Sequence, residues 1–327
     1  MKNILVTGGA GYIGSHACKV LRENGYTPVA FDNLATGWQD AVRFGPFEHG
    51  DLCDRDRLDQ VFERYHPHAV MHFAALSQVG ESVEKPGLYW RNNVLGSLNL
   101  IEAAVAADCR KLVFSSTCAT YGDQDGVVLD EDSSQYPANS YGSSKRAIEE
   151  MLRDFEAAHG LRSVTFRYFN VAGADPEAEV GEFHRPETHL IPLILDVIEG
   201  KRADLTIFGT DYDTPDGTCI RDYVHVMDLV DAHVLGLKWL EDGNPSRVFN
   251  LGTGHGFSVR EVVDEVRRVT NKAIACKEGP RRDGDCAKLV SGSDRAIREL
   301  GWRPDRSSLE RMVADAWKWH QKGGYSS

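Results

Sequence analysis

The chain has 327 residues, and its 49 acidic against 37 basic side chains give a formal net charge of -12. An acidic chain without basic runs argues against a nucleic-acid partner, because neutralisation of phosphates dominates affinity for DNA and RNA. No stretch approaches the roughly 18 consecutive apolar residues that span a bilayer, so no membrane partner is expected. At roughly 150 residues per domain, the length predicts about two domains.

The first half of the chain alternates short apolar runs with segments of helical periodicity. Buried strands are predicted at residues 4–7, 28–32, 69–73, 111–115 and 163–168. Helices are predicted between them, at residues 58–65 and 93–107. Steady alternation of strand and helix is typical of an α/β fold, in which helices cover both faces of a doubly wound parallel sheet.

The second half of the chain is less regular. It has loop-like stretches at 174–187 and 210–218, and predicted helices near 190–199, 226–239, 259–270 and 309–319. We expect a first domain over residues 1–171, to which segments near 219–245 return. A smaller, interleaved α/β domain is expected over residues 172–327.

Seven cysteines are spread along the chain without a C-x-x-C pair. This pattern favours reduced thiols in the cytoplasm and argues against a structural zinc site. His66 and His68 have no neighbouring cluster of ligand residues, so no metal is expected. The apolar part of the N-terminus is too short for a signal peptide, which also favours a cytoplasmic protein.

A glycine-rich turn, with Gly8, Gly11 and Gly14, follows the first predicted strand. A tight turn from strand to helix needs positive φ, and a pyrophosphate approaches bare backbone at a helix N-terminus. The turn therefore predicts a Rossmann-type dinucleotide site; a turn without a ligand is the alternative. Asp32 ends the second strand, where a carboxylate binds the ribose hydroxyls and repels a 2′-phosphate. This favours NAD over NADP, with a capping role for Asp32 as the alternative.

Tyr141 and Lys145 form a Y-x-x-x-K pair on a predicted helix over residues 140–153. One helical turn apart, they share a face, and the ammonium is expected to lower the tyrosine pKa from about 10 toward neutrality. Tyr141 would then serve as a general base. Thr117 follows the fourth predicted strand, at the sheet edge where ligands bind. The alternatives are a solvated pair on a helix surface and a hydroxyl that caps a strand.

These motifs, in this order, resemble the extended short-chain dehydrogenase/reductase family, and in particular its UDP-glucose 4-epimerase branch. The resemblance covers nearly the whole chain. Its more specific motifs are HFAALSQVGES (72–82), YGDQ (121–124), RYFN (167–170), RDYVHVMD (221–228), NLGTG (250–254) and PRRDGD (280–285).

The resemblance implies which residues bind the two ligands. Beside the glycine turn, those implied for NAD are Tyr12, Ile13, Asp32, Asn33, Asp51, Leu52, Phe73, Ala74, Asn92, Tyr141, Lys145 and Tyr168. Those implied for a UDP-sugar are Thr117, Tyr141, Asn170, Leu190, Phe208, Arg221, Arg282 and Asp285. An acidic protein needs local cations for a diphosphate, and arginine makes bidentate contacts, although a surface salt bridge is the alternative for either arginine.

The resemblance also implies the reaction, a reversible inversion at C4 between UDP-galactose and UDP-glucose. Tyr141 would take the proton of the 4-hydroxyl, Thr117 would hydrogen-bond that hydroxyl, and Lys145 would bind the nicotinamide ribose and keep Tyr141 ionised. NAD would be regenerated in each cycle, with no net redox. A homodimer is implied as well.

Other functions remain as alternatives. Nucleotide-sugar 4,6-dehydratases carry an Asp-Glu pair after the residue equivalent to Thr117, where this chain has Cys118 and Ala119. N-acetylated, uronate and pentose UDP-sugars stay open as substrates, as does an NAD-dependent dehydrogenase with net redox. A non-catalytic NAD-binding sensor is the alternative from another class, and it would not need Tyr141, Lys145 and Thr117.

At three positions the chain differs from residues that relatives in the family carry. Thr117 replaces a serine and adds a methyl group to the same hydroxyl. Ser77 stands where some relatives have a lysine that reaches the cofactor ribose, so one charged contact is missing. Leu289 is intermediate in size at a position that bears on whether an N-acetylated sugar fits.

Overall fold

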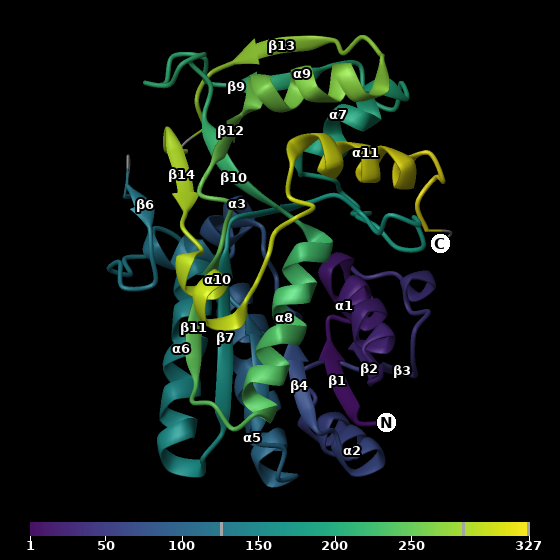
Figure 1. Cartoon of the computed structure of the whole chain (residues 1–327), viewed down its shortest axis with the longest axis vertical. Helices are drawn as coiled ribbons and strands as arrows, with labels where there is room; N and C mark the ends of the chain where they lie inside the picture. Colours follow the sequence, from purple (N-terminus) through teal and green to yellow (C-terminus); the bar gives the residue numbers. More distant parts are fainter. Residues whose placement is uncertain (125–126, 283–284, 326–327) are drawn as a thin grey trace.

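The computed structural model describes residues 1–124, 127–282 and 285–325, and its main element is a large parallel sheet (Figure 1). Its seven strands lie in the order β11-β7-β5-β4-β1-β2-β3, and all neighbouring strands are parallel. Their bounds are β1 Asn3–Thr7, β2 Thr27–Asp32, β3 Phe47–His49, β4 Ala69–His72, β5 Lys111–Ser115, β7 Arg162–Tyr168 and β11 Arg247–Leu251. The α/β doubly wound fold is confirmed.

Helices cover both faces of this sheet (Figure 1). One face carries α1 (Tyr12–Glu23), α8 (Val226–Glu241) and α10 (Asp294–Leu300), and the other carries α2 (Arg55–Tyr65), α5 (Gly96–Ala106) and α6 (Ser140–His159). Alternate residues of β1 point to opposite faces of the sheet. Ile4 and Val6 belong to a first core that includes α1 and α8, and Leu5 belongs to a second core that includes α2 and α5. Burial on both sides explains why these strands read as continuous apolar runs.

The second half of the chain forms most of a second, smaller layer, which consists of two further sheets and the helices packed on them. A mixed sheet has the order β12-β10-β14-β6, with β8 paired to β10, and β13 pairs with β9. The strands are β6 Val128–Leu129, β8 Asn170–Ala172, β9 Leu205–Phe208, β10 Ile220–His225, β12 Gly256–Ser258, β13 Cys276–Gly279 and β14 Lys288–Ser291. Helices α7 (Leu190–Ile198), α9 (Val259–Thr270) and α11 (Leu309–His320) pack together in a third core.

Chain segments cross between the two layers in both directions. The second-half elements α8, β11 and α10 pack in the core of the large sheet, whereas β6 of the first half pairs with β14. The predicted domain limits of 1–171 and 172–327 therefore stay a prediction.

The short elements of the first half are η1 Gln39–Ala41, α3 Val79–Glu84, α4 Pro86–Tyr89, the π-helix η2 Trp90–Leu95 and η3 Cys118–Tyr121. Within the described ranges, no helix is long and apolar enough to cross a membrane.

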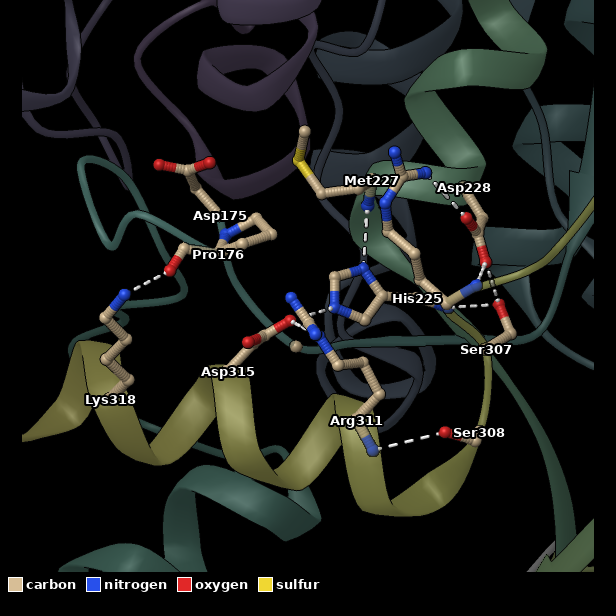
Figure 2. A network of polar contacts seen from close by, with 12 residues as sticks. Asp175, Pro176, His225, Met227, Asp228, Ser307, Ser308, Arg311, Asp315 and Lys318 are labelled. Atoms are coloured by element: carbon tan, nitrogen blue, oxygen red, sulfur yellow. Dashed lines mark hydrogen bonds and ion pairs between the residues drawn. The ribbon is translucent and has the colours of Figure 1, made fainter.

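The buried imidazole of His225 joins the two layers at the junction of β10 and α8 (Figure 2). Its Nδ1 accepts a hydrogen bond from the Met227 amide at 3.1 Å, so the neutral ring carries its proton on Nε2. Nε2 lies 3.2 Å from Oδ2 of Asp315 on α11, and Arg311 donates to the same oxygen at 2.6 Å. Asp228, in the first turn of α8, accepts a hydrogen bond from the hydroxyl of Ser307 at 2.7 Å.

We predict that Asp315→Asn destabilises the fold at neutral pH by about 1–3 kcal/mol, because it replaces a buried charged acceptor that pairs with the buried His225 and with Arg311. Burial raises the pKa of Asp315, but hydrogen bonds from His225 and Arg311 outweigh it and leave that pKa below its usual value. The stabilisation is therefore present above the unfolded-state pKa of about 3.9 and is lost as pH falls through the lower folded pKa.

Urea unfolding of the wild type and Asp315→Asn at a series of pH values measures this effect. The difference in unfolding free energy is expected to shrink below about pH 4. The exposed Asp305 provides a matched control, Asp305→Asn, for which we expect no such difference. A difference that stays constant down to acid pH would contradict the assignment.

Candidate active site

A cavity of about 950 Å³ lies at the carboxyl ends of the large-sheet strands. Ligands of open α/β sheets bind at this edge. Of the predicted site residues, Leu190 and Phe208 are not among those that line the cavity. The lining includes Gly8, Gly11, Tyr12, Ile13, Gly14, Asp32, Asn33, Asp51, Leu52, Phe73, Ala74, Asn92, Thr117, Tyr141, Lys145, Tyr168, Asn170, Arg221, Arg282 and Asp285. The fold thus brings together side chains from both halves of the chain.

The glycine turn is held by close backbone contacts. Gly8 has a φ of 72°, and a Cβ on Gly14 would lie 2.0 Å from the Gly8 carbonyl oxygen. Gly11 is the N-cap of α1, and no side chain caps this helix end. A Cβ on Gly11 would meet only the Gly8 oxygen, at 3.3 Å, so it would project into the space beside the helix N-terminus. This cradle fits a pyrophosphate, which needs bare backbone and free amide donors.

Asp32 ends β2 beside this turn. One carboxylate oxygen accepts a hydrogen bond from the Ala10 amide at 3.0 Å, and the other accepts one from the Leu34 amide at 2.8 Å. Burial raises the pKa of Asp32, although the two amide hydrogen bonds oppose this shift. Because each oxygen has a second lone pair, the carboxylate also fits the two ribose hydroxyls that the sequence predicts.

Lys145 and Tyr141 lie in the first turns of α6, whose N-cap Asn139 accepts a hydrogen bond from the Gly142 amide at 2.9 Å. The buried Lys145 ammonium donates to the Ser115 carbonyl at 2.8 Å and lies 4.9 Å from the Phe114 ring centre. This is its one hydrogen bond within the described part of the chain. The lysine therefore has further N–H donors for a ligand in the cavity.

Burial dominates the ionisation of this pair. It raises the pKa of Tyr141 to about 12, against an opposing hydrogen bond with Thr117. It also lowers the pKa of Lys145 to about 7, although the Glu149 carboxylate acts in the opposite direction. The prediction that Lys145 lowers the tyrosine pKa toward neutrality is therefore wrong for the protein by itself. The physical reason is desolvation, which disfavours both the phenolate and the ammonium.

A buried ion pair supports the end of β5 and the helix that carries Lys145. Arg167 on β7 makes a bidentate contact with Glu149 of α6, with N–O distances of 2.5 and 3.0 Å, and both side chains are less than a tenth exposed. Ser116 donates to the same carboxylate, and Arg167 also donates to the Tyr121 hydroxyl. The RYFN motif contained Arg167, but sequence analysis assigned it no partner because Glu149 is distant in the chain.

Two arginines form the second-half wall of the cavity. Arg221 of β10 donates to the Cys286 carbonyl at 3.0 Å and lies 3.3 Å from Asp285, which also pairs with Arg282 at 2.8 Å. The Arg282 guanidinium lies 5.3 Å from the Phe208 ring centre, which places Phe208 beside the cavity. Paired guanidinium groups on a cavity wall fit a diphosphate, since they supply charge-assisted donors. Leu190 begins α7 and packs against the third core.

Sequence analysis missed four cavity neighbours, Glu182, His184, Glu187 and His189. Their ligand atoms all lie within 4.8 Å of one another. Burial lowers the pKa of His184, but the two carboxylates outweigh it and raise that pKa to about 9. The spacing Glu-x-His-x-x-Glu-x-His is the signal that could have found them.

A family model described as "NAD dependent epimerase/dehydratase family" matches residues 4–252. The chain belongs to this NAD dependent epimerase/dehydratase family. A UDP-glucose 4-epimerase of Rhizobium meliloti is 50% identical to the chain over 320 residues, which cover 98% of this chain and 97% of the relative.

Solved structures of the epimerase/dehydratase family have the same fold. UDP-glucose 4-epimerase from Brucella ovis, crystallised in complex with NAD, is 46% identical, with a TM-score of 0.95 over 97% of this chain and 98% of that one. UDP-glucose 4-epimerase from Bifidobacterium longum, in complex with NAD+ and UDP, is 34% identical, with a TM-score of 0.92 over 98% of each chain.

We predict that Gly14→Ala destabilises the protein and weakens its retention of NAD. Its Cβ would lie 2.0 Å from the backbone oxygen of Gly8, so the turn must shift, at a cost of about 1–3 kcal/mol. Thermal unfolding and the cofactor content of the purified variant measure both effects. The control is Gly87→Ala in α4, where the nearest atom lies 3.7 Å away and no loss is expected. Equal stability and equal NAD content in the two variants would contradict the assignment of the glycine turn as the pyrophosphate-binding site.

Proposed function

We propose that the protein is a UDP-glucose 4-epimerase that uses NAD to interconvert UDP-galactose and UDP-glucose. The observation that carries the proposal is the position of Thr117, Tyr141 and Lys145. They line one cavity between the glycine turn and Arg221. Relatives of that name match almost the whole chain, and the Brucella ovis structure contains NAD. The cavity volume, about 950 Å³, is at the upper end of the range for ligand pockets, about 300–1,000 Å³.

Bound NAD supplies the reversible two-electron oxidation of an alcohol to a ketone. The chain provides proton transfer and orientation. Tyr141 takes the proton of the C4 hydroxyl on its phenolate oxygen, and the Thr117 hydroxyl hydrogen-bonds the same substrate oxygen. Because burial favours neutral Tyr141, ionisation requires positive charge close to the phenol. Lys145 supplies one such charge in its ammonium form, and its remaining N–H donors fit a ribose diol.

Inversion at C4 requires that the 4-keto sugar turn over between its oxidation and its reduction while the nucleotide stays bound. Arg221 suits this task, because its side chain is only 14% exposed and two backbone carbonyls orient its guanidinium. Arg282 adds a second charge and Asn170 an amide on β8. In this proposal, most of the binding free energy comes from the UDP part, and the hexose is held by few contacts.

An elimination chemistry is less well supported by the same cavity. The residue after Thr117 is the fully buried Cys118, and burial raises the pKa of its thiol far above the usual range. Cys118 therefore does not replace the acid of a dehydratase. Leu289 lines the cavity, so the acceptance of N-acetylated sugars is part of the test below.

We further propose a cytoplasmic homodimer. All seven cysteines are free in the structure, which suits a reducing compartment. The dimer is proposed from the family resemblance, through helices such as α5 and α6.

The first test is incubation of the purified protein with UDP-galactose, without added NAD, and quantification of UDP-glucose by chromatography. We expect the two sugars to equilibrate without net formation of NADH. Net redox with added NAD would indicate a dehydrogenase instead. Absence of conversion even after NAD is supplied would contradict the galactose assignment. The same assay with N-acetylated, uronate and pentose UDP-sugars then defines the substrate range.

We predict that Tyr141→Phe lowers turnover by about 10²–10⁴-fold, since it removes the general base. UDP affinity, measured by calorimetry, is expected to stay unchanged because Arg221 and Arg282 are intact. Tyr136→Phe is the control, since Tyr136 is 75% exposed and is expected to have no effect on turnover. Retention of more than about a tenth of the wild-type rate by Tyr141→Phe would refute the base assignment.

A further inference from the structure

Two imidazoles and two carboxylates converge between β8 and α7. Nδ1 of His189 lies 3.0 Å from Oε1 of Glu182 and 2.9 Å from Oε1 of Glu187. Nδ1 of His184 lies 3.5 Å from an oxygen of each carboxylate. The His184 nitrogen is buried and makes no hydrogen bond of good geometry with any described residue. The His184 nitrogen therefore faces both carboxylates at ion-pair distance without a hydrogen bond to either.

The charge of this group is unusual for its burial. The Glu182 side chain is 7% exposed and that of Glu187 is 12% exposed. Within the described ranges, neither carboxylate pairs with a lysine or an arginine, and the two imidazoles are their cationic partners. Buried carboxylates are paired or bind metals. Charge neutrality is therefore reached with two imidazolium rings, or with two neutral imidazoles around one divalent cation.

The ligand atoms, one from each residue, all lie within 4.8 Å of one another, which is close enough for the second arrangement. A tetrahedral zinc ion with bonds of about 2.0–2.1 Å separates neighbouring ligand atoms by about 3.3 Å. The nitrogen–oxygen distances are 2.9 and 3.0 Å at His189 and 3.5 Å twice at His184, with the two imidazoles facing different oxygens of Glu187. Imidazole with carboxylate is a ligand set that suits Zn²⁺, whereas Mg²⁺ and Ca²⁺ prefer oxygen alone.

We propose that Glu182, His184, Glu187 and His189 bind one divalent transition-metal ion of the Zn²⁺ class. This assignment differs from the sequence expectation that no metal binds, which rested on the cysteine pattern and on His66 and His68.

The site would connect the two halves of the cavity wall. His189 is the N-cap of α7, and the His184 ring lies edge-on to Tyr12, at 6.4 Å between centres, in the first turn of α1. Glu182, His184 and His189 line the cavity. A bound metal ion would therefore hold the segment 182–189 against α1, the helix that follows the glycine turn. Zinc binding itself does not depend on the proposed epimerase activity, so the two proposals are tested separately.

The test is equilibrium dialysis of the full-length, tag-free protein, first stripped with EDTA, against Zn²⁺ in the absence of nucleotide. We expect one Zn²⁺ per chain, with no comparable binding of Mg²⁺. His184→Ala and Glu187→Gln are each expected to weaken zinc affinity at least about tenfold. His189→Asn, which keeps much of the side-chain volume, guards against misfolding, and circular dichroism checks the fold of each variant.

Two controls separate this site from other zinc ligands. His255→Ala and Glu177→Gln change exposed residues that do not belong to the group, and unchanged affinity is expected. Cobalt substitution should give visible d–d bands without thiolate charge transfer, which excludes the seven free cysteines as ligands. Substoichiometric binding, a thiolate spectrum, or equal affinity in the cluster variants and the controls would overturn the proposal.

Discussion

All strands of the large sheet run in the same direction, so the carboxyl ends of β1, β2, β4, β5 and β7 meet at one edge. This constraint places the glycine turn, Asp32 and Thr117 around one cavity although they are far apart in the chain. Helices on both faces close the sheet to water, and the exposed strand ends are where polar groups remain available. The rest of the candidate site is built around this edge.

The second half of the chain adds two arginines, Arg221 and Arg282, to the cations that can bind an anionic ligand. The whole chain carries a net charge of -12, yet Lys145, Arg221 and Arg282 all line the cavity. The buried pair of Glu149 and Arg167 supports this arrangement from behind, since Glu149 lies one turn after Lys145. These cations stand in a cavity whose lining also includes acidic residues such as Asp32 and Asp285, and they offer local positive charge to the phosphates of a dinucleotide and a nucleotide sugar.

Sequence patterns predicted the fold best where strands are buried on both faces. The predicted strand at 111–115 and the predicted helix at 259–270 agree with β5 and α9 at both ends. In the second half, strands such as β13 and β12 are short and partly exposed, so they have no apolar run that distinguishes them from loops. The short β3 at the edge of the large sheet was missed for the same reason. Register with a neighbouring strand defines these elements, and register is a property of the assembled sheet.

The sequence by itself determined the local chemistry: the glycine turn, the Tyr141–Lys145 pair and Asp32 at the end of a strand. Each of these features depends only on the spacing of residues along one element. Only the tertiary structure decided what depends on surroundings. Desolvation, not the neighbouring ammonium, sets the direction of the Tyr141 pKa shift, and burial is absent from a linear pattern. The convergence of His184 and Glu187 with their neighbours likewise required the folded segment between β8 and α7, since ligand atoms meet only once the backbone has turned.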